Sequence, residues 1–177
     1  GTVPLAAHQI AIHCASSAFM VPLGLSIATS MRIGRAVGEG RTAALRPIGF
    51  GAIGSGVAFM GSAAVVFVAA GWWLARAFTP DAAVVALAVR LLGVAAIFLM
   101  VDGTQVIGSA ALRGLADVRV PTAVTFVAYW VIAVPLGYGL AFRSAVGPVG
   151  VWIGLAAGLA FAAGCLAWRF HRKTMTT

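Results

Sequence analysis

Five apolar stretches, each about as long as a membrane span and separated by short basic segments, limit what this chain can fold into. The chain is 62% hydrophobic and only 9% charged, with a mean hydropathy of +1.03. Soluble domains are closer to half apolar and about a quarter charged. Because 177 residues could not bury this much apolar surface in water, we predict an all-α integral membrane protein in contact with the lipid bilayer.

The apolar runs predict five transmembrane helices, at residues of about 6–30, 47–75, 82–112, 120–142 and 146–168. The third predicted helix is preceded by Thr79-Pro80-Asp81, a sequence typical of a helix start. Pro22 and Pro135 fall inside spans and predict kinks, either static or used as bending points. Four tryptophans lie toward span ends, where indoles favour the membrane interface: Trp72, Trp73, Trp152 and Trp168.

The basic residues predict the orientation, because segments rich in Arg and Lys stay in the cytoplasm. Three segments on one side of the membrane hold nine of the twelve basic residues: Arg32, Arg35, Arg41, Arg46, Arg113, Arg119, Arg169, Arg172 and Lys173. The other side holds Arg76, Arg90 and Arg143. We therefore expect a multi-pass protein of a bacterial plasma (inner) membrane with a cytoplasmic C-terminus. The net charge of +8 reflects this topology, and no nucleic acid partner is expected.

Asp102 is a lone carboxylate near the centre of the apolar segment 91–112, between Arg90 and Arg113 at its ends. A charge at the bilayer centre costs roughly 2.5–3.5 kcal/mol on insertion scales, so such residues usually face a water-filled cavity and handle ions, protons or charged substrates. The alternative is a protonated acid that is hydrogen-bonded to a neighbouring helix. We favour the first interpretation, because one carboxylate can hold a proton, a Na⁺ or a cationic substrate in turn.

Other polar and aromatic residues could join this site. Gln105 and Ser109, at i+3 and i+7, share roughly the face of Asp102. We expect Gln105 to help bind the cation and Ser109 to hydrogen-bond a neighbouring helix. Tyr129 could contact an organic cation through its ring, or could simply pack between helices.

The two histidines of the first span do not predict a metal site. His8 and His13 are five residues apart and point about 140° away from each other on a helix of 3.6 residues per turn. One ion could not be chelated from one face by this pair. His13 remains a candidate as a titratable residue of a cavity.

Seven short motifs occur in order along nearly the whole chain: AAHQIA at 6–11, FMVPLG at 19–24, RIGRAVGEG at 32–40, DGTQV at 102–106, ALRG at 111–114, AYW at 128–130 and PLGY at 135–138. This series resembles the multidrug and toxic compound extrusion (MATE) family, and within it the NorM-like bacterial branch. The resemblance implies a twelve-helix transporter with two lobes around a central cavity. The chain looks like helices eight to twelve, which form most of the C-terminal lobe.

The resemblance also implies a function and partners. Such proteins are antiporters that export organic cations and drugs in exchange for Na⁺ or H⁺, without a cofactor. The N-terminal lobe and the first helix of the C-terminal lobe would be missing partners of this chain. We therefore expect the chain to be a fragment of a longer one.

The resemblance also implies roles for four individual residues. Asp102 matches the family's cation-binding aspartate of the tenth helix, and Gln9 matches a polar residue of the eighth helix that lines the drug cavity. Phe98 stands where some relatives have a tyrosine, and without a hydroxyl it weakens the case for a Na⁺ site. His13 stands where relatives commonly have asparagine, which would alter the polarity or the pH response of the cavity.

Two other functions remain open at this point. A lipid-precursor flippase of the same superfamily would need several cationic residues in its cavity to hold a diphosphate, whereas the one charged residue at mid-membrane is acidic. A non-transporting membrane scaffold would tolerate substitution of Asp102. No Ser-His-Asp or paired-carboxylate arrangement is visible in the sequence, so we do not expect an enzyme.

Overall fold

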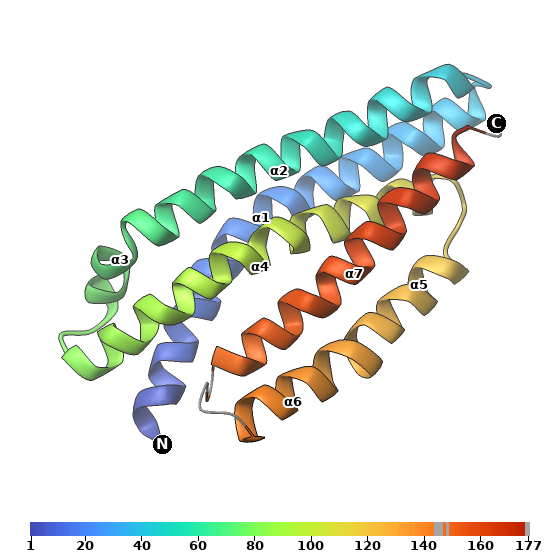
Figure 1. Ribbon diagram of the computed structural model, residues 1–177. Coiled ribbons are helices and arrows are strands. Elements are labelled where there is room, and N and C mark those ends of the chain that lie inside the picture. The colour runs from blue at the N-terminus through green and yellow to red at the C-terminus, as the bar shows by residue number, and fades with distance from the viewer. Residues whose placement is uncertain (144–146, 148, 176–177) are drawn as a thin grey trace.

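Nearly all of the described structure, a computed structural model covering residues 1–143, 147 and 149–175, is helical. The helices form an elongated bundle whose two chain ends lie at opposite ends of its long axis (Figure 1). Within the described residues, five helical segments are long and apolar enough to cross a membrane: Thr2–Gly38, Thr42–Ala69, Ala82–Gly114, Arg119–Arg143 and Val149–Lys173. The predicted all-α architecture with five membrane helices is therefore confirmed.

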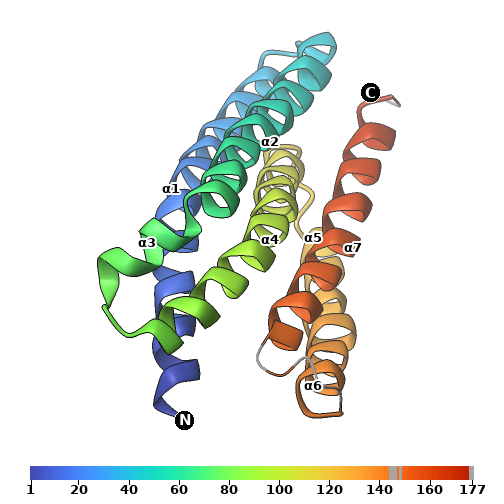
Figure 2. The ribbon, with the colours of Figure 1, turned by 60° about the vertical axis from the view of Figure 1, so that its left-hand side comes forward.

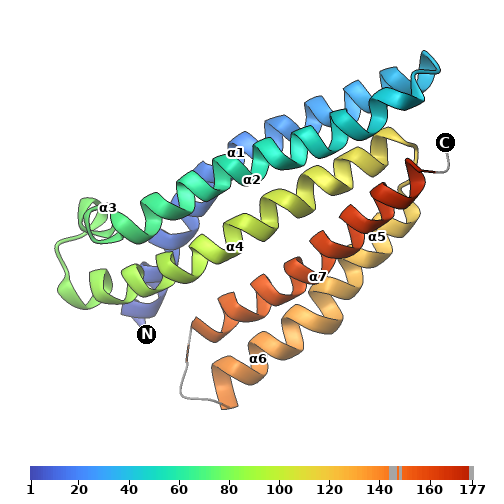
Figure 3. The ribbon, with the colours of Figure 1, turned by 45° about the horizontal axis from the view of Figure 1, so that its top comes forward.

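Helix α4 (Ala82–Gly114) lies at the centre of the bundle and packs against α1 (Thr2–Gly38), α2 (Leu45–Ala69) and α7 (Val149–Lys173). Its side chains fill the main core, in which Leu91, Leu92 and Leu99 are fully buried. Figure 3 shows α4 between the α1–α2 pair and α7. Asp102 of α4 is half-buried and lies where α1, α4 and α7 meet.

The remaining span runs beside α7 and consists of three segments, as Figure 2 shows for α5 and α6. They are α5 (Arg119–Phe126), a π-helical segment η2 (Val127–Ala133) and α6 (Val134–Arg143). Pro135 lacks the N–H that would close an α-helical turn, and π-type i→i+5 bonds let a carbonyl before a proline pair with a residue beyond it. The interruption predicted at Pro135 thus takes the form of a π-helical segment.

Helix α1 is longer than the predicted span of 6–30. It continues beyond the apolar stretch to Gly38, where Arg35 and Glu39 form an i,i+4 ion pair with 2.7 Å between Nε and Oε1. The chain then leaves the helix at Gly40, which has a φ of 68°, a conformation that glycine adopts most easily. A short 3₁₀ turn, η1 (Thr42–Ala44), leads into α2.

The predicted helix at 47–75 is right as far as Ala69 and wrong beyond it. The helix breaks at Ala70, and a separate short helix, α3 (Gly71–Phe78), follows. Gly71 and Ala75 are buried in the bundle, where α3 packs on α4, while Trp72 and Trp73 remain exposed. The break lets α3 place its indoles outward, as expected for side chains at a membrane interface.

The third and fourth predicted helices, at 82–112 and 120–142, agree with the structure to within two residues at each end. Asp81 caps α4 by accepting hydrogen bonds from the backbone N–H groups of Ala83 and Val84, at 2.8 and 3.3 Å. This confirms the predicted start signal. The predicted start of the fifth helix at Val146 lies outside the described residues, and its end extends from 168 to Lys173.

Candidate functional site

Asp102 borders a cavity of about 260 Å³ between α1, α4 and α7. The carboxylate is half-buried, and the cavity wall around it is largely aliphatic and aromatic. The lining residues are His8, Ile12, Ala15, Ser16, Phe19, Phe98, Asp102, Trp152 and Leu155. The structure therefore brings together two of the predicted site residues, Asp102 and Phe98, and adds His8 and Trp152 beside them.

The carboxylate of Asp102 has no partner within the described part of the chain: no group donates a hydrogen bond to it and no cation pairs with it. The alternative of a protonated acid hydrogen-bonded to a neighbouring helix therefore finds no hydrogen-bond partner, donor or acceptor, among the described residues. Tyr129, in η2, is half-buried and close enough to interact electrostatically with Asp102, although it does not line the cavity. An acid in this position is free to take up a proton or a cation.

Trp152 contacts two other side chains that line the cavity, Phe98 and His8. Only 4% of this residue is exposed, so it is not one of the interfacial indoles predicted from its place near a span end. Its ring lies edge-on to Phe98 and to His8, with centroids 5.6 and 5.7 Å away. Its indole N–H donates a hydrogen bond to Nδ1 of His8 over 3.3 Å.

This hydrogen bond determines the tautomer of His8. An indole nitrogen can only donate, so Nδ1 of His8 must accept, and the proton of the neutral imidazole lies on Nε2. His8 is thus a polar group on the cavity wall, bonded there to Trp152 of α7. The sequence did not predict that His8 lines this cavity, because the contact depends on α7, which is distant in sequence. The one local indication is that His8 and Ile12, one turn apart, share a face of the helix.

Gln105 and Ser109 do not reach the Asp102 cavity. Gln105 is buried, and its amide nitrogen donates to Thr125 Oγ1 of α5 over 3.4 Å. It lines a separate cavity of about 420 Å³, together with Ser109. Ser109 accepts a hydrogen bond from Arg113 of the same helix, at 3.0 Å, so the helix-to-helix hydrogen bond predicted for Ser109 is wrong.

Gln9 and His13 are exposed and line no part of the cavity. They lie one turn apart on a face of α1 that also exposes Met20 and Ile27. This face adjoins the cavity-lining side of the helix but is covered by no described element. The predicted contacts of Gln9 and His13 with a substrate remain predictions, which need a surface opposite this face.

The donor set of the cavity limits what it can bind. Among its lining side chains, oxygen comes from Asp102 and Ser16, and the remaining surface is carbon apart from the His8 and Trp152 rings. In the described residues, no group of three or more His, Cys, Asp or Glu side chains is placed to hold a metal ion. One acid beside aromatic rings suits a proton or an organic cation, since desolvated cation–π contacts contribute up to about 2 kcal/mol.

Comparisons with known proteins agree with this architecture. The model of the MatE family matches residues 1–139. The chain is 49% identical to the multidrug resistance protein NorM of Burkholderia vietnamiensis, over 98% of this chain and 39% of that protein. It is 43% identical to the probable multidrug resistance protein NorM of Pseudomonas aeruginosa, over 98% of this chain and 37% of that protein. The chain thus spans less than half the length of these curated relatives.

Solved structures share the fold. An outward-facing multidrug resistance MATE family transporter of the MOP superfamily superimposes with a TM-score of 0.90 at 21% identity, over 99% of this chain and 40% of that one. An inward-facing structure of such a transporter gives a TM-score of 0.80 at 20% identity, over 94% of this chain and 38% of that one. Family model, relatives and fold agree that this multi-pass membrane chain belongs to the MatE family.

Proposed function

We propose that the protein is a multidrug exporter that exchanges organic cations for protons across the membrane. The observation that carries this proposal is the unpaired Asp102 in a cavity walled by Phe98 and Trp152, midway along the central helix. The names of the curated relatives, which are multidrug resistance proteins, support the export of drugs. No cofactor is needed for this exchange.

We place the chain in the C-terminal lobe of a twelve-helix transporter, with its C-terminus in the cytoplasm. The uneven distribution of basic residues, nine against three, supports this orientation. The uncovered face of α1 that carries Gln9 and His13 supports a partner surface there, supplied by the N-terminal lobe and by the first helix of the C-terminal lobe. Between these surfaces lies the drug cavity.

Proton and drug movement are coupled because a proton and an organic cation compete for the carboxylate of Asp102. Protonated Asp102 is neutral and releases an organic cation, whereas ionised Asp102 attracts one. A low-dielectric wall strengthens this attraction, and the Phe98 and Trp152 rings add dispersion and cation–π contact. Because proton and drug cannot occupy the carboxylate together, inward proton movement is tied to outward drug movement.

A proton suits this cavity better than Na⁺ does. Hard metal cations are held by several oxygen ligands, and the lining offers only the Asp102 carboxylate and the Ser16 hydroxyl. Phe98, one turn from Asp102, has no oxygen to contribute. A proton needs only the carboxylate.

Dye export from proteoliposomes with the full-length protein tests this function. A pH gradient and a Na⁺ gradient are imposed separately, with a fluorescent organic cation as cargo. We expect export to follow the pH gradient and to disappear in Asp102→Asn. Asp81→Asn is the matched control, because it makes the same carboxylate-to-amide change on the same helix and asparagine caps helices equally well.

Each other outcome contradicts part of the proposal. Export that follows only the Na⁺ gradient would replace the proton as coupling ion. Export that ignores both gradients and is equal in Asp102→Asn would favour the flippase or scaffold functions. Loss of export in Asp81→Asn as well would assign the effect to folding of α4 rather than to the cavity.

A further inference from the structure

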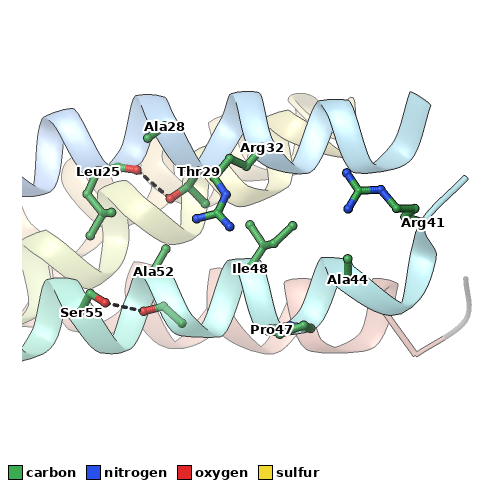
Figure 4. A pocket seen from close by; sticks show the side chains of 11 residues that line it. Leu25, Ala28, Thr29, Arg32, Arg41, Ala44, Pro47, Ile48, Ala52 and Ser55 are labelled. Carbon is green, nitrogen blue, oxygen red and sulfur yellow. Dashed lines mark hydrogen bonds between the residues drawn. The ribbon is translucent and has the colours of Figure 1, made fainter. Parts of the chain in front are cut away.

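A second cavity, of about 490 Å³, lies between α1 and α2, away from the Asp102 site. It runs as a groove from Arg41, at the basic end of the bundle, to Leu25 and Ser55 deeper along the two helices (Figure 4). None of its lining residues borders the Asp102 cavity. The groove is therefore a separate feature, which drug export does not explain.

Two guanidinium groups point into this groove. Figure 4 shows Arg32 of α1 and Arg41 of the α1–α2 turn with their nitrogens directed into the space between the helices. Within the described part of the chain, Arg32 makes no hydrogen bond or ion pair. Both arginines are exposed, so an anionic group at the membrane surface can reach them, and basic residues near that surface attract anionic lipids.

The nearby carboxylate does not neutralise this end of the groove. Glu39 receives hydrogen bonds from Arg35 and Arg41, at 2.7 and 2.6 Å, which hold the pKa of Glu39 below its ordinary value and keep it ionised. Together with Arg32, seven residues earlier on α1, three arginines and one carboxylate thus lie at this end of the α1–α2 pair. Two positive charges remain in excess at the mouth of the groove.

The start of α2 also borders the groove. The N–H of Leu45, the first residue of α2, donates to the carbonyl oxygen of Thr42, so α2 directly continues the 3₁₀ turn η1. Ala44 and Pro47, at this start, line the groove. The beginning of α2 and the two guanidinium groups therefore border the same space.

The rest of the groove is apolar. Ile48, Ala52 and Leu25 continue its walls away from the arginines, and Leu25 lies seven residues, or about 10 Å of helix, from Arg32. The hydroxyl groups of Thr29 and Ser55 donate to carbonyls of their own helices, at 2.6 and 2.9 Å. A free phosphate ion would gain nothing from this surface, whereas an acyl chain would fill it.

We propose that this groove binds an anionic phospholipid, with its phosphate held by Arg32 and Arg41 and an acyl chain lying along Leu25, Ile48 and Ala52. Arginine matches phosphate geometry with paired N–H groups, and basic pockets between transmembrane helices are known sites for lipid head groups. The bound lipid joins α1 to α2.

Lipid binding to the full-length protein, purified in detergent, tests the proposal by native mass spectrometry. The probes are phosphatidylglycerol and phosphatidylcholine with identical acyl chains. We expect the wild type to prefer phosphatidylglycerol, and each of Arg32→Gln and Arg41→Gln to weaken its binding about 5-fold. The double variant should lose on the order of 25-fold, if each basic residue contributes independently. Arg41→Lys keeps the charge but not the paired N–H groups, so it should bind more tightly than Arg41→Gln and less tightly than the wild type.

Arg119→Gln is the matched control, because it removes an arginine at the same end of the bundle but outside the groove. It should bind phosphatidylglycerol like the wild type, and unchanged helical content should show that every variant is folded. Equal binding of the two lipids, or full binding by the double variant, would overturn the proposal. Displacement of the lipid by millimolar inorganic phosphate would also overturn it, in favour of a free anion. Equal loss in Arg119→Gln would show unspecific attraction and refute the site.

Discussion

The indole N–H of Trp152 donates to Nδ1 of His8 over 3.3 Å, which links the first and last helices of the chain. The same indole packs edge-on against Phe98 of the central helix. One side chain therefore joins α1, α4 and α7 around the cavity that holds Asp102. Trp152 was not among the residues singled out by the resemblance to MATE transporters, although it lines this cavity beside Phe98 and Asp102.

Trp152→Phe separates the hydrogen bond from the packing. Phenylalanine keeps a ring beside Phe98 but leaves Nδ1 of His8 without its donor. A neutral hydrogen bond contributes about 1 kcal/mol, so the dye concentration for half-maximal export should rise up to about 5-fold. The melting temperature should change little, whereas Trp152→Ala should lower it by leaving a void. Unchanged export in Trp152→Phe would show that the His8 contact is irrelevant to transport.

Close helix contact at Gly154 leads to a second prediction. A Cβ placed on Gly154 would overlap the backbone nitrogen and Cα of Gly137 on α6, so Gly154→Ala should force α6 and α7 apart. Overpacking typically costs about 1–3 kcal/mol, and the melting temperature in detergent should fall accordingly.

Gly164→Ala is the control on the same helix, because no atom lies within 4 Å of its Cβ position. Alanine favours a helix over glycine by roughly 0.5–1 kcal/mol, so this variant should be as stable as the wild type or more so. Equal destabilisation of both variants would contradict the close packing of α6 on α7.

Much of the fold could be predicted, because span length and charge bias are local properties of a sequence. The start of α4 at Asp81 is an example, since the cap acts within one helical turn. The break at Ala70 could not be predicted, because it depends on Gly71 and Ala75 packing on α4 while Trp72 and Trp73 face outward. The hydropathy of that stretch continues without interruption.

The candidate site likewise contains residues that could be predicted from the sequence and contacts that could not. Asp102 was predicted from its place in an apolar segment, and Phe98, one turn away on the same helix, from the resemblance to the MATE family. Gln105, three residues from Asp102, instead donates to Thr125 on α5, a partner that helix periodicity cannot reveal. His8 and Trp152 meet across 144 residues, so their contact exists only in the folded protein.

An ion-pair cluster at the end of α7 predicts a pH dependence of stability. Asp117 is buried, with Nε of Arg169 at 2.7 Å and Nζ of Lys173 at 3.1 Å. These hydrogen bonds, that from Arg169 foremost, hold the pKa of Asp117 below its ordinary value. A depressed pKa in the folded state stabilises the protein above the unfolded pKa of about 3.9, and this contribution is lost as the pH falls through the folded value.

Asp117→Asn should therefore lower stability at neutral pH by about 1–2 kcal/mol, between the values typical of exposed and buried pairs. Its melting temperature should fall less than that of the wild type when the pH is lowered through 4. Asp81→Asn, which keeps its helix cap, should follow the wild type. Parallel curves for the wild type and Asp117→Asn would contradict a stabilising role of the cluster.

Proton release that accompanies drug uptake tests the central role of Asp102 most directly. A pH-sensitive dye would report proton movement in proteoliposomes containing the full-length protein when an organic cation is added without an imposed gradient. The wild type and Asp81→Asn should exchange protons for the cation, and Asp102→Asn should move none. Undiminished exchange in Asp102→Asn would show that another group carries the proton and would contradict the account.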